Sequence, residues 1–262
     1  MTVKAIRYSE DHWLRSRDSE KAVSACMEQQ SKAYSRIKTG YVLELLGCLD
    51  SLRFLDYGCG AGLFVVLGAK AGAARIVGVD AEDGALSTAR YFAHREGVAE
   101  RCHFIRCRRF PSFPPGTRFD AVLMKDVIEH VEDDQALLDA AAEALAPGGI
   151  IVLSTQNAVS LNYAIESTYH RIIRNERDWC GWDPTHLRFY TPRTLERLLK
   201  NAGFRSVDWR SVYIVPYKLP PLPFSNGRFF RIDCLSMVDR ALGRRFPFNR
   251  IGWNVIIKAV KS

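Results

Sequence analysis

The sequence lacks several features that would set it apart from an ordinary globular protein of the cytoplasm. No apolar run approaches the ~20 residues of a membrane-spanning helix, and the N-terminus has no apolar signal-peptide segment. The seven cysteines are scattered and include no Cys-x-x-Cys pair, which argues against a disulfide framework or a cysteine zinc site. Internal repeats and low-complexity segments are also missing. We therefore expect a cytoplasmic globular chain with free thiols.

Acidic residues are scarce in the C-terminal part of the chain. The formal net charge is +8, and residues 158–262 hold 18 Lys and Arg against 8 Asp and Glu. A basic half suits an anionic partner, such as a phosphorylated substrate, RNA or a membrane surface, and it equally suits a solvated face. Because no recognised RNA-binding module is present, RNA is the weaker of these alternatives.

What the chain does contain is a regular alternation of short apolar strands and helical patterns. Strands are predicted at residues 54–56, 75–80, 103–106, 119–124, 150–154, 206–215 and 253–260. Helices are predicted at residues 63–71, 83–96, 134–146 and 192–201, with an N-terminal pair at 19–37 and 41–49 joined through residues 35–41. This alternation predicts an α/β fold with an open, doubly wound, mostly parallel seven-stranded sheet. Its ligand would lie at the carboxyl ends of the strands.

The predicted sheet is centred on a glycine turn at the end of the first strand. Gly58, Gly60 and Gly62 follow Asp56, and Asp80 ends the second strand. Glycines let the backbone approach a ligand closely, and an acid at the end of the second strand can accept hydrogen bonds from ribose hydroxyls. The spacing differs from the Gly-x-Gly-x-x-Gly of dinucleotide folds, and an acid before the turn suits an ammonium better than a pyrophosphate.

Four ordered motifs extend this pattern. They are Leu55-Asp-Tyr-Gly-Cys-Gly-Ala-Gly62, Val77-Gly-Val-Asp80, Phe119-Asp-Ala-Val122 and Leu145-Ala-Pro-Gly-Gly149. Together they resemble the successive motifs of class I S-adenosylmethionine-dependent methyltransferases. The resemblance implies a Rossmann-like methyltransferase fold with an antiparallel last strand and helical cover insertions. It also implies a set of cofactor-binding residues: Lys38, Asp56, Gly58, Gly60, Gly62, Asp80, Ala81 and, through its backbone, Lys125.

One position departs from the family pattern. Where the family commonly has an Asp after the third strand, accepting a hydrogen bond from the adenine amino group, this chain has Cys107-Arg108. We expect adenine to be held there by backbone amides and apolar walls, or by Arg108 stacked on the ring.

Polar residues follow the fourth strand, at the sheet edge where a methyl group must be delivered. Asp126, Glu129 and His130 can share one face of a helical turn, and His186 lies in the long segment after the fifth strand. Carboxylates and imidazoles suit a divalent cation, Mg²⁺ or Mn²⁺, whereas His130 alone suits a general base. In a purely structural alternative, Glu129 caps the next helix. Our hypothesis is that Glu129, His130 and His186 are catalytic and bind a metal together with Asp126.

These residues resemble two methyltransferase subfamilies. Ubiquinone-type O-methyltransferases carry a similar Glu-x-x-Glu-His segment and a later Thr-His, matched here by Thr185-His186. Small-RNA 3′-terminal 2′-O-methyltransferases bind a catalytic metal through such a segment and a downstream His. Asp126 stands in place of the first Glu and is one methylene shorter. The ubiquinone-type resemblance, which we favour, also places Lys38 where that group has an Arg near the cofactor carboxylate.

The leading functional hypothesis is methyl transfer from S-adenosylmethionine to an oxygen of a small or lipid-like acceptor. A basic, aromatic cover would hold an apolar acceptor with an anionic group, or touch a membrane surface. The aromatic residues predicted for this cover, which would alternatively form only its own core, are Trp179, Trp182, Tyr213, Phe224, Phe229 and Phe230. RNA 2′-O-methylation is the alternative enzyme activity, and a catalytically silent cofactor-binding partner protein is the alternative of another class. A hydride-transfer enzyme is a remote option.

We expect these parts to form one structural domain. Its predicted segments are an N-terminal helical cap (1–50), the S-adenosylmethionine-binding core (51–157), a substrate-cover insertion (158–190), a continuation of the core (191–215), a second cover insertion (216–250) and the last core strand (251–262).

Overall fold

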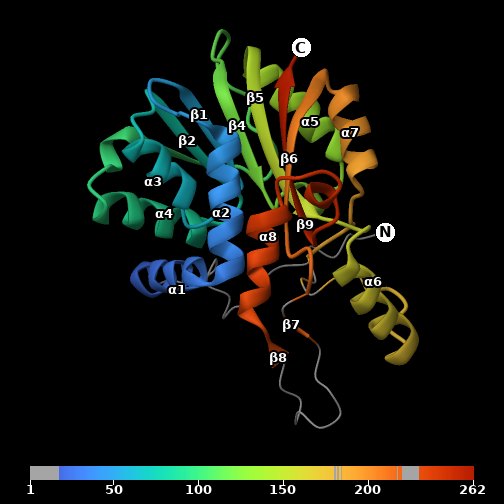
Figure 1. The fold of residues 1–262 in the computed structure, drawn as a ribbon. Helices are drawn as coiled ribbons and strands as arrows, with labels where there is room; N and C mark the ends of the chain where they lie inside the picture. The colour runs from blue at the N-terminus through green and yellow to red at the C-terminus, as the bar shows by residue number, and fades with distance from the viewer. Residues whose placement is uncertain (1–17, 180, 182, 184, 217, 220–229) are drawn as a thin grey trace, which may run out of the picture.

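The computed structural model describes residues 18–179, 181, 183, 185–216, 218–219 and 230–262. A seven-stranded sheet forms its centre, with helices on both faces (Figure 1). The strands are β1 (Arg53–Tyr57), β2 (Arg75–Asp80), β3 (Cys102–Arg106), β4 (Phe119–Lys125), β5 (Leu145–Gln156), β6 (Phe204–Val212) and β9 (Asn254–Lys261). Their order is β3-β2-β1-β4-β5-β9-β6, and β9 runs antiparallel to both neighbours while the other contacts are parallel. The predicted doubly wound sheet with an antiparallel last strand is confirmed.

Two apolar layers hold the helices against the sheet. On one face, Leu45, Phe54, Val65 and Ile76 belong to a cluster beneath α2 (Ala33–Leu46), α3 (Leu63–Lys70) and α4 (Asp83–Arg95). On the other, Phe119, Leu138 and Leu199 belong to a cluster beneath α5 (Asp134–Ala144) and α7 (Pro192–Asn201). The central strands bury side chains on both faces, as parallel strands covered by helices do.

The N-terminal helices divide at a different place from the one predicted. Helix α1 (Ser19–Ser31) ends at Lys32, whose backbone is extended, and α2 starts at the next residue. The predicted junction at 35–41 is wrong, because that stretch lies inside α2 and Tyr41 and Val42 are buried against the core. This helix therefore carries Lys38 on a buried face, where only 3% of the residue is exposed.

Additional helices and a hairpin lie beside the carboxyl ends of the parallel strands. Helix α6 (Leu161–Thr168) continues into a π-helical turn, η4 (Tyr169–Ile173), and both lie away from the sheet in Figure 1. The later segment contains the hairpin β7 (Lys218–Leu219) and β8 (Phe230–Arg231), the short turns η5 (Asp233–Leu235) and η6 (Phe248–Arg250), and α8 (Ser236–Leu242). Among the described residues, no helix is both long enough and apolar enough to cross a bilayer.

The chain order places the two ligand-facing loops side by side. The chain runs from β1 outward to β3 and then returns to β4, which pairs with β1 on its other side. At such a switch point the loops after two neighbouring strands diverge and leave a crevice. Here the loops after β1 and β4 approach so closely that a Cβ on Gly58 would lie 2.4 Å from Val127 Cγ2.

Candidate active site

A cavity of about 770 Å³ opens at the carboxyl ends of the central strands. Most of the predicted site residues line it: Lys38, Asp56, Gly58, Gly60, Asp80, Ala81, Lys125, Asp126, His130 and His186. Gly62 and Glu129 are the exceptions. Gly62 has a φ of 80° at the start of α3, and a Cβ there would lie 2.8 Å from the Ala89 side chain of α4. Its role is therefore in helix packing, whereas Glu129 lies fully buried behind the cavity wall.

Asp56 is a buried carboxylate on the cavity wall. The residue is 1% exposed, and neither of its side-chain oxygens has a hydrogen-bond partner among the described residues. Burial raises the pKa of Asp56 to about 7, although the positive charge of Lys125 opposes this shift. A buried carboxylate is normally paired, so its position on the cavity wall fits a ligand that carries an ammonium.

Asp80 is held in place by the glycine turn. The Gly60 N–H donates to one carboxylate oxygen at 2.9 Å and the Glu82 N–H donates to the other at 3.0 Å. Both carboxylate oxygens keep acceptor capacity for the hydroxyls of a ribose. Beyond it, Cys107 and Arg108 line the cavity, and the Cys107 N–H donates to the Asp80 carbonyl at 2.9 Å.

Asp126 contacts two lysines and does not join the group of Glu129, His130 and His186. Its carboxylate accepts from Lys38 Nζ at 2.5 Å and Lys125 Nζ at 3.0 Å, and also from Ser154 Oγ at 3.0 Å and Asn254 Nδ2 at 3.2 Å. Burial alone would raise the pKa of Asp126, but the charges of Lys125 and Lys38 outweigh it and hold that pKa well below its usual range. Its φ of 56° is unusual for a residue other than glycine. The structure therefore leaves Asp126 outside the predicted metal-binding group.

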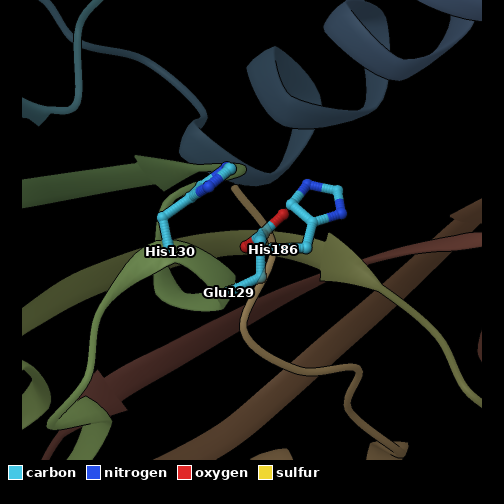
Figure 2. Close-up of side chains that lie close together, drawn as sticks. All are labelled: Glu129, His130 and His186. Carbon is cyan, nitrogen blue, oxygen red and sulfur yellow. The ribbon is translucent and has the colours of Figure 1, made fainter. Parts of the chain in front are cut away.

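The other three predicted ligands do come together. Glu129 and His130 lie in the turn η3 (Ile128–His130), and His186 approaches from the segment after α6 (Figure 2). One donor atom from each lies within 4.8 Å of the others. The Leu187 N–H donates to the Glu129 carbonyl at 2.8 Å, which fixes the two segments against each other. One carboxylate and two imidazoles form a donor set that suits Mn²⁺ better than Mg²⁺.

Burial sets the protonation of this group. It raises the pKa of Glu129 to about 8, with a further contribution from the negative charge of Asp126. Glu129 Oε2 accepts from Thr155 Oγ1 at 2.9 Å, whereas Oε1 has no hydrogen-bond partner among the described residues. Burial lowers the pKa of His186 to about 4, and His130 adds to the shift. His186 is therefore neutral at physiological pH, as a metal ligand must be.

Aromatic side chains adjoin the acceptor end of the cavity. Phe189 contacts the rings of Tyr163 and Trp253 at centroid distances of 4.7 and 5.4 Å, and Trp179 lies 6.3 Å from it. Of the predicted cover aromatics, Trp179 belongs to this cluster, whereas Tyr213 packs edge-on against Tyr34 at 5.8 Å. Phe230 lies in β8. Trp182, Phe224 and Phe229 lie outside the described residues.

Several residues of the site were missed by the sequence-based prediction. Thr155 and Asn254 donate to the predicted residues Glu129 and Asp126, and Asp183 lies 3.9 Å from Nε2 of the predicted His186. Trp253 and Gln156 line the cavity. Gln156 is the last residue of β5 and Asn254 is the first residue of β9, and the two are register partners. That antiparallel pairing is a long-range contact, so no local motif identified them.

Comparison with known proteins identifies the family. A family profile described as "Methyltransferase domain" matches residues 29–208. The chain belongs to this methyltransferase family. The matched residues include strands β1 to β5, the glycine turn and Asp80, and the resemblance to methyltransferases predicted from the four motifs is confirmed.

Relatives of this methyltransferase extend the comparison. A ubiquinone biosynthesis O-methyltransferase of Dinoroseobacter shibae is 34% identical over 170 residues, which are 63% of this chain and 64% of the relative. The chain thus spans less than two thirds of that relative's length. An S-adenosylmethionine-dependent methyltransferase from Mesorhizobium loti has a similar fold, with a TM-score of 0.59 at 18% identity over 86% of this chain and 98% of the other. The magnesium protoporphyrin IX methyltransferase of Synechocystis, solved with S-adenosylhomocysteine bound, gives a TM-score of 0.56 at 16% identity over 88% and 86%.

Proposed function

We propose that this protein transfers a methyl group from S-adenosylmethionine to a hydroxyl oxygen of a small, lipid-like acceptor. One observation carries the proposal. A single cavity is lined at one end by the carboxylate of Asp56, which has no hydrogen-bond partner within the described part of the chain, and at the other by His130 and His186. The named relative, a ubiquinone biosynthesis O-methyltransferase, supports oxygen as the accepting atom.

The cofactor end of the cavity fits the groups of S-adenosylmethionine. Asp56 would bind the ammonium, and Asp80 would accept from the ribose hydroxyls. Lys38 donates to both oxygens of Asp126 and would bind the cofactor carboxylate through its third N–H. The cofactor supplies an electrophilic methyl group on a positively charged sulfur. Gly58 lets the turn pack directly against Val127, which keeps the donor end close to the loop that carries the acceptor residues.

The acceptor end contains the groups that can activate a hydroxyl. His130 can accept the hydroxyl proton as the oxygen attacks the methyl carbon, while the sulfonium becomes a neutral thioether. Glu129, His130 and His186 would together hold a divalent cation, whose charge would lower the pKa of a bound hydroxyl. Both routes use the same three side chains and differ in their need for a cation.

The cover fits an apolar acceptor near a lipid surface. The ring cluster of Tyr163, Phe189 and Trp253 lies next to His186, which suits a flat apolar body. In η4, Ile172 and Ile173 are 74% and 70% exposed, beside the exposed cation Arg171. Apolar side chains flanked by arginines are typical of helices that lie on membranes.

The decisive experiment measures methyl transfer from S-adenosylmethionine with a labelled methyl group. The acceptors are a set of catechols with and without an alkyl chain, a lipid extract, and a small RNA with a free 2′-hydroxyl at its 3′ end. We expect label on the alkylated catechols and in the lipid extract, with activity lost on chelation and restored by Mn²⁺. Label on RNA alone would replace the proposed acceptor class. Activity that survives chelation would support direct proton transfer to His130.

Membrane contact is tested separately. Wild-type protein should sediment with vesicles containing anionic lipid and should do so less at high salt. The Ile172→Asp variant should lose most of this binding, while the matched control Val207→Asp, at an exposed position on β6, should not. Equal sedimentation of the wild type and Ile172→Asp would exclude η4 as the contact.

A further inference from the structure

The segment that carries His186 also contacts His130, through Thr185. The Thr185 hydroxyl oxygen lies 2.8 Å from His130 Nδ1 and 2.6 Å from an oxygen of Asp183. The Thr185 carbonyl oxygen lies 3.3 Å from the same imidazole nitrogen. The Thr185 N–H donates to that Asp183 oxygen at 2.8 Å. Two oxygens of one residue therefore face one nitrogen of His130, and Asp183 holds that residue from behind.

The number of available hydrogens decides the direction of each hydrogen bond. One oxygen of Asp183 accepts from both the hydroxyl and the N–H of Thr185, so this carboxylate is the acceptor in both hydrogen bonds. The single hydroxyl hydrogen of Thr185 must then point to Asp183. The hydroxyl oxygen is left to accept, and the carbonyl oxygen also can only accept. Both contacts require a hydrogen on His130 Nδ1.

This assignment fixes the tautomer of the imidazole. A neutral imidazole has one N–H and one lone pair, so a hydrogen on Nδ1 leaves the lone pair on Nε2. The hydrogen bond from the Leu187 N–H to the Glu129 carbonyl holds Thr185–Leu187 against η3. Thr185 and His186 therefore reach Glu129 and His130 from consecutive positions in the chain. Histidines that bind metals or accept protons are commonly oriented in this way through their second nitrogen.

We propose that Thr185 and Asp183 are positioning residues that fix the tautomer and ring orientation of His130. They direct the Nε2 lone pair to the acceptor hydroxyl, or to a cation held with Glu129 and His186. This proposal deepens the proposed function and rests on it for its catalytic consequence. The tautomer itself is a property of the protein alone and can be measured without cofactor or acceptor.

The first test reads the tautomer directly. The protein, labelled with ¹⁵N at its histidine rings, is examined at pH 8 by long-range ¹H–¹⁵N correlation spectroscopy. The chain has six histidines, and the signal missing in His130→Ala assigns His130. We expect the Nδ1–H form in the wild type and in Thr185→Ser, and a shift toward the Nε2–H form in Thr185→Val. An Nε2–H form in the wild type, or an unchanged spectrum in Thr185→Val, would overturn the proposal.

The second test separates positioning from a general structural role. Thr185→Val and Asp183→Asn should lower kcat at least tenfold and weaken Mn²⁺ binding by about 10–100-fold, with S-adenosylhomocysteine affinity within twofold of the wild type. Thr185→Ser should restore kcat. Thr117→Val is the matched control, since Thr117 lies outside the cavity lining. Equal losses of cofactor binding and activity with a wild-type His130 tautomer would overturn the proposal.

The proposed tautomer of His130 and the proposed methyl transfer can be disproved separately. If Thr185→Val does not fold, the test uses Asp183→Asn and Thr185→Ser. Asp183→Asn weakens the hydrogen bonds that hold Thr185 but keeps the size of the side chain at position 183. If the wild type methylates no acceptor but shows the Nδ1–H form, the proposed function fails while the assignment of Thr185 and Asp183 to His130 stands.

Discussion

The cofactor end and the acceptor end of the cavity are built in different ways. The cofactor end comes from the ends of adjacent parallel strands, where the Gly58 N–H donates to the Val79 carbonyl and the Gly60 N–H donates to the Asp80 carboxylate. The acceptor end joins η3 to a segment more than fifty residues later, through side chains and the bond from Leu187 to Glu129. The first is specified by strand order, and the second by contacts that form only when the cover is in place.

Two carboxylates show the same contrast within one cavity. Asp56 has no hydrogen-bond partner among the described residues, and burial raises its pKa to about 7. Asp126 accepts from four side chains, and its pKa is held well below the usual range. A carboxylate that is already neutralised supports the cavity wall, whereas one without a donor is prepared for a cationic ligand. We therefore propose that Asp56 binds the ligand and that Asp126 has a supporting role.

Replacement of His130 should separate the two ends most clearly. His130→Ala should lower turnover by about 10²–10⁴-fold, the usual contribution of a positioned acid or base, while S-adenosylhomocysteine binds as to the wild type. The measurement pairs methyl-transfer kinetics with calorimetric titration. His103→Ala is the control, because His103 is exposed and outside the cavity lining. A comparable loss of cofactor affinity in His130→Ala would show that the ends are not independent.

Replacement of Asp56 should have the opposite effect on binding. Asp56→Asn should weaken S-adenosylhomocysteine binding about 100-fold, because a buried charge-assisted contact is lost. Since the pKa of Asp56 is raised to about 7 and the ammonium needs the ionised form, wild-type affinity should rise between pH 5.5 and pH 8. The variant should lack this rise, and Asp139→Asn, on an exposed face of α5, should retain it. A flat wild-type profile would contradict the role of Asp56.

Replacement of Lys38 should weaken cofactor binding less than replacement of Asp56. Lys38→Met should weaken S-adenosylhomocysteine binding about tenfold, since one charged contact to the carboxylate is worth roughly 1.5 kcal/mol. Binding of 5′-methylthioadenosine, which lacks the amino-acid end, should remain within twofold. Lys200→Met, at an exposed position on α7, controls for the loss of charge. If both ligands weaken equally, Lys38 shapes the cavity and does not bind the carboxylate.

Replacement of Glu129 should change the stability of the protein, with the smallest of the expected effects. Burial raises the pKa of Glu129 from 4.5 to about 8, so the folded protein keeps a proton that the unfolded chain loses. The free energy of unfolding should therefore fall as pH rises between these values. Glu129→Gln removes this penalty and should raise the thermal midpoint at pH 8.5, by about 2–4 °C for each kcal/mol recovered. Little change is expected at pH 4.5, and a lower midpoint at pH 8.5 would contradict the assigned protonation.

The sequence by itself determined the cofactor end. Strands β1 and β2, the glycine turn and Asp80 were predicted from local patterns, because apolar runs, glycine spacing and an acid at a strand end all lie within about 30 residues. The helix α7 was predicted with its bounds, since Thr191 and Pro192 form a recognisable N-terminus. Short-range patterns sufficed here, because adjacent parallel strands bring their carboxyl ends to one edge of the sheet.

Only the tertiary structure decided the acceptor end. Sequence spacing grouped Asp126 with Glu129 and His130, but Asp126 leaves β4 with a left-handed backbone and meets Lys38 from α2 and Asn254 from β9. Thr185 likewise gains its role from a contact 55 positions away in the chain. A side chain's neighbours, and therefore its charge, depend on long-range packing that no local period encodes. That packing leaves Asp56 without a hydrogen-bond donor among the described residues, neutralises Asp126 and places His130 and His186 together.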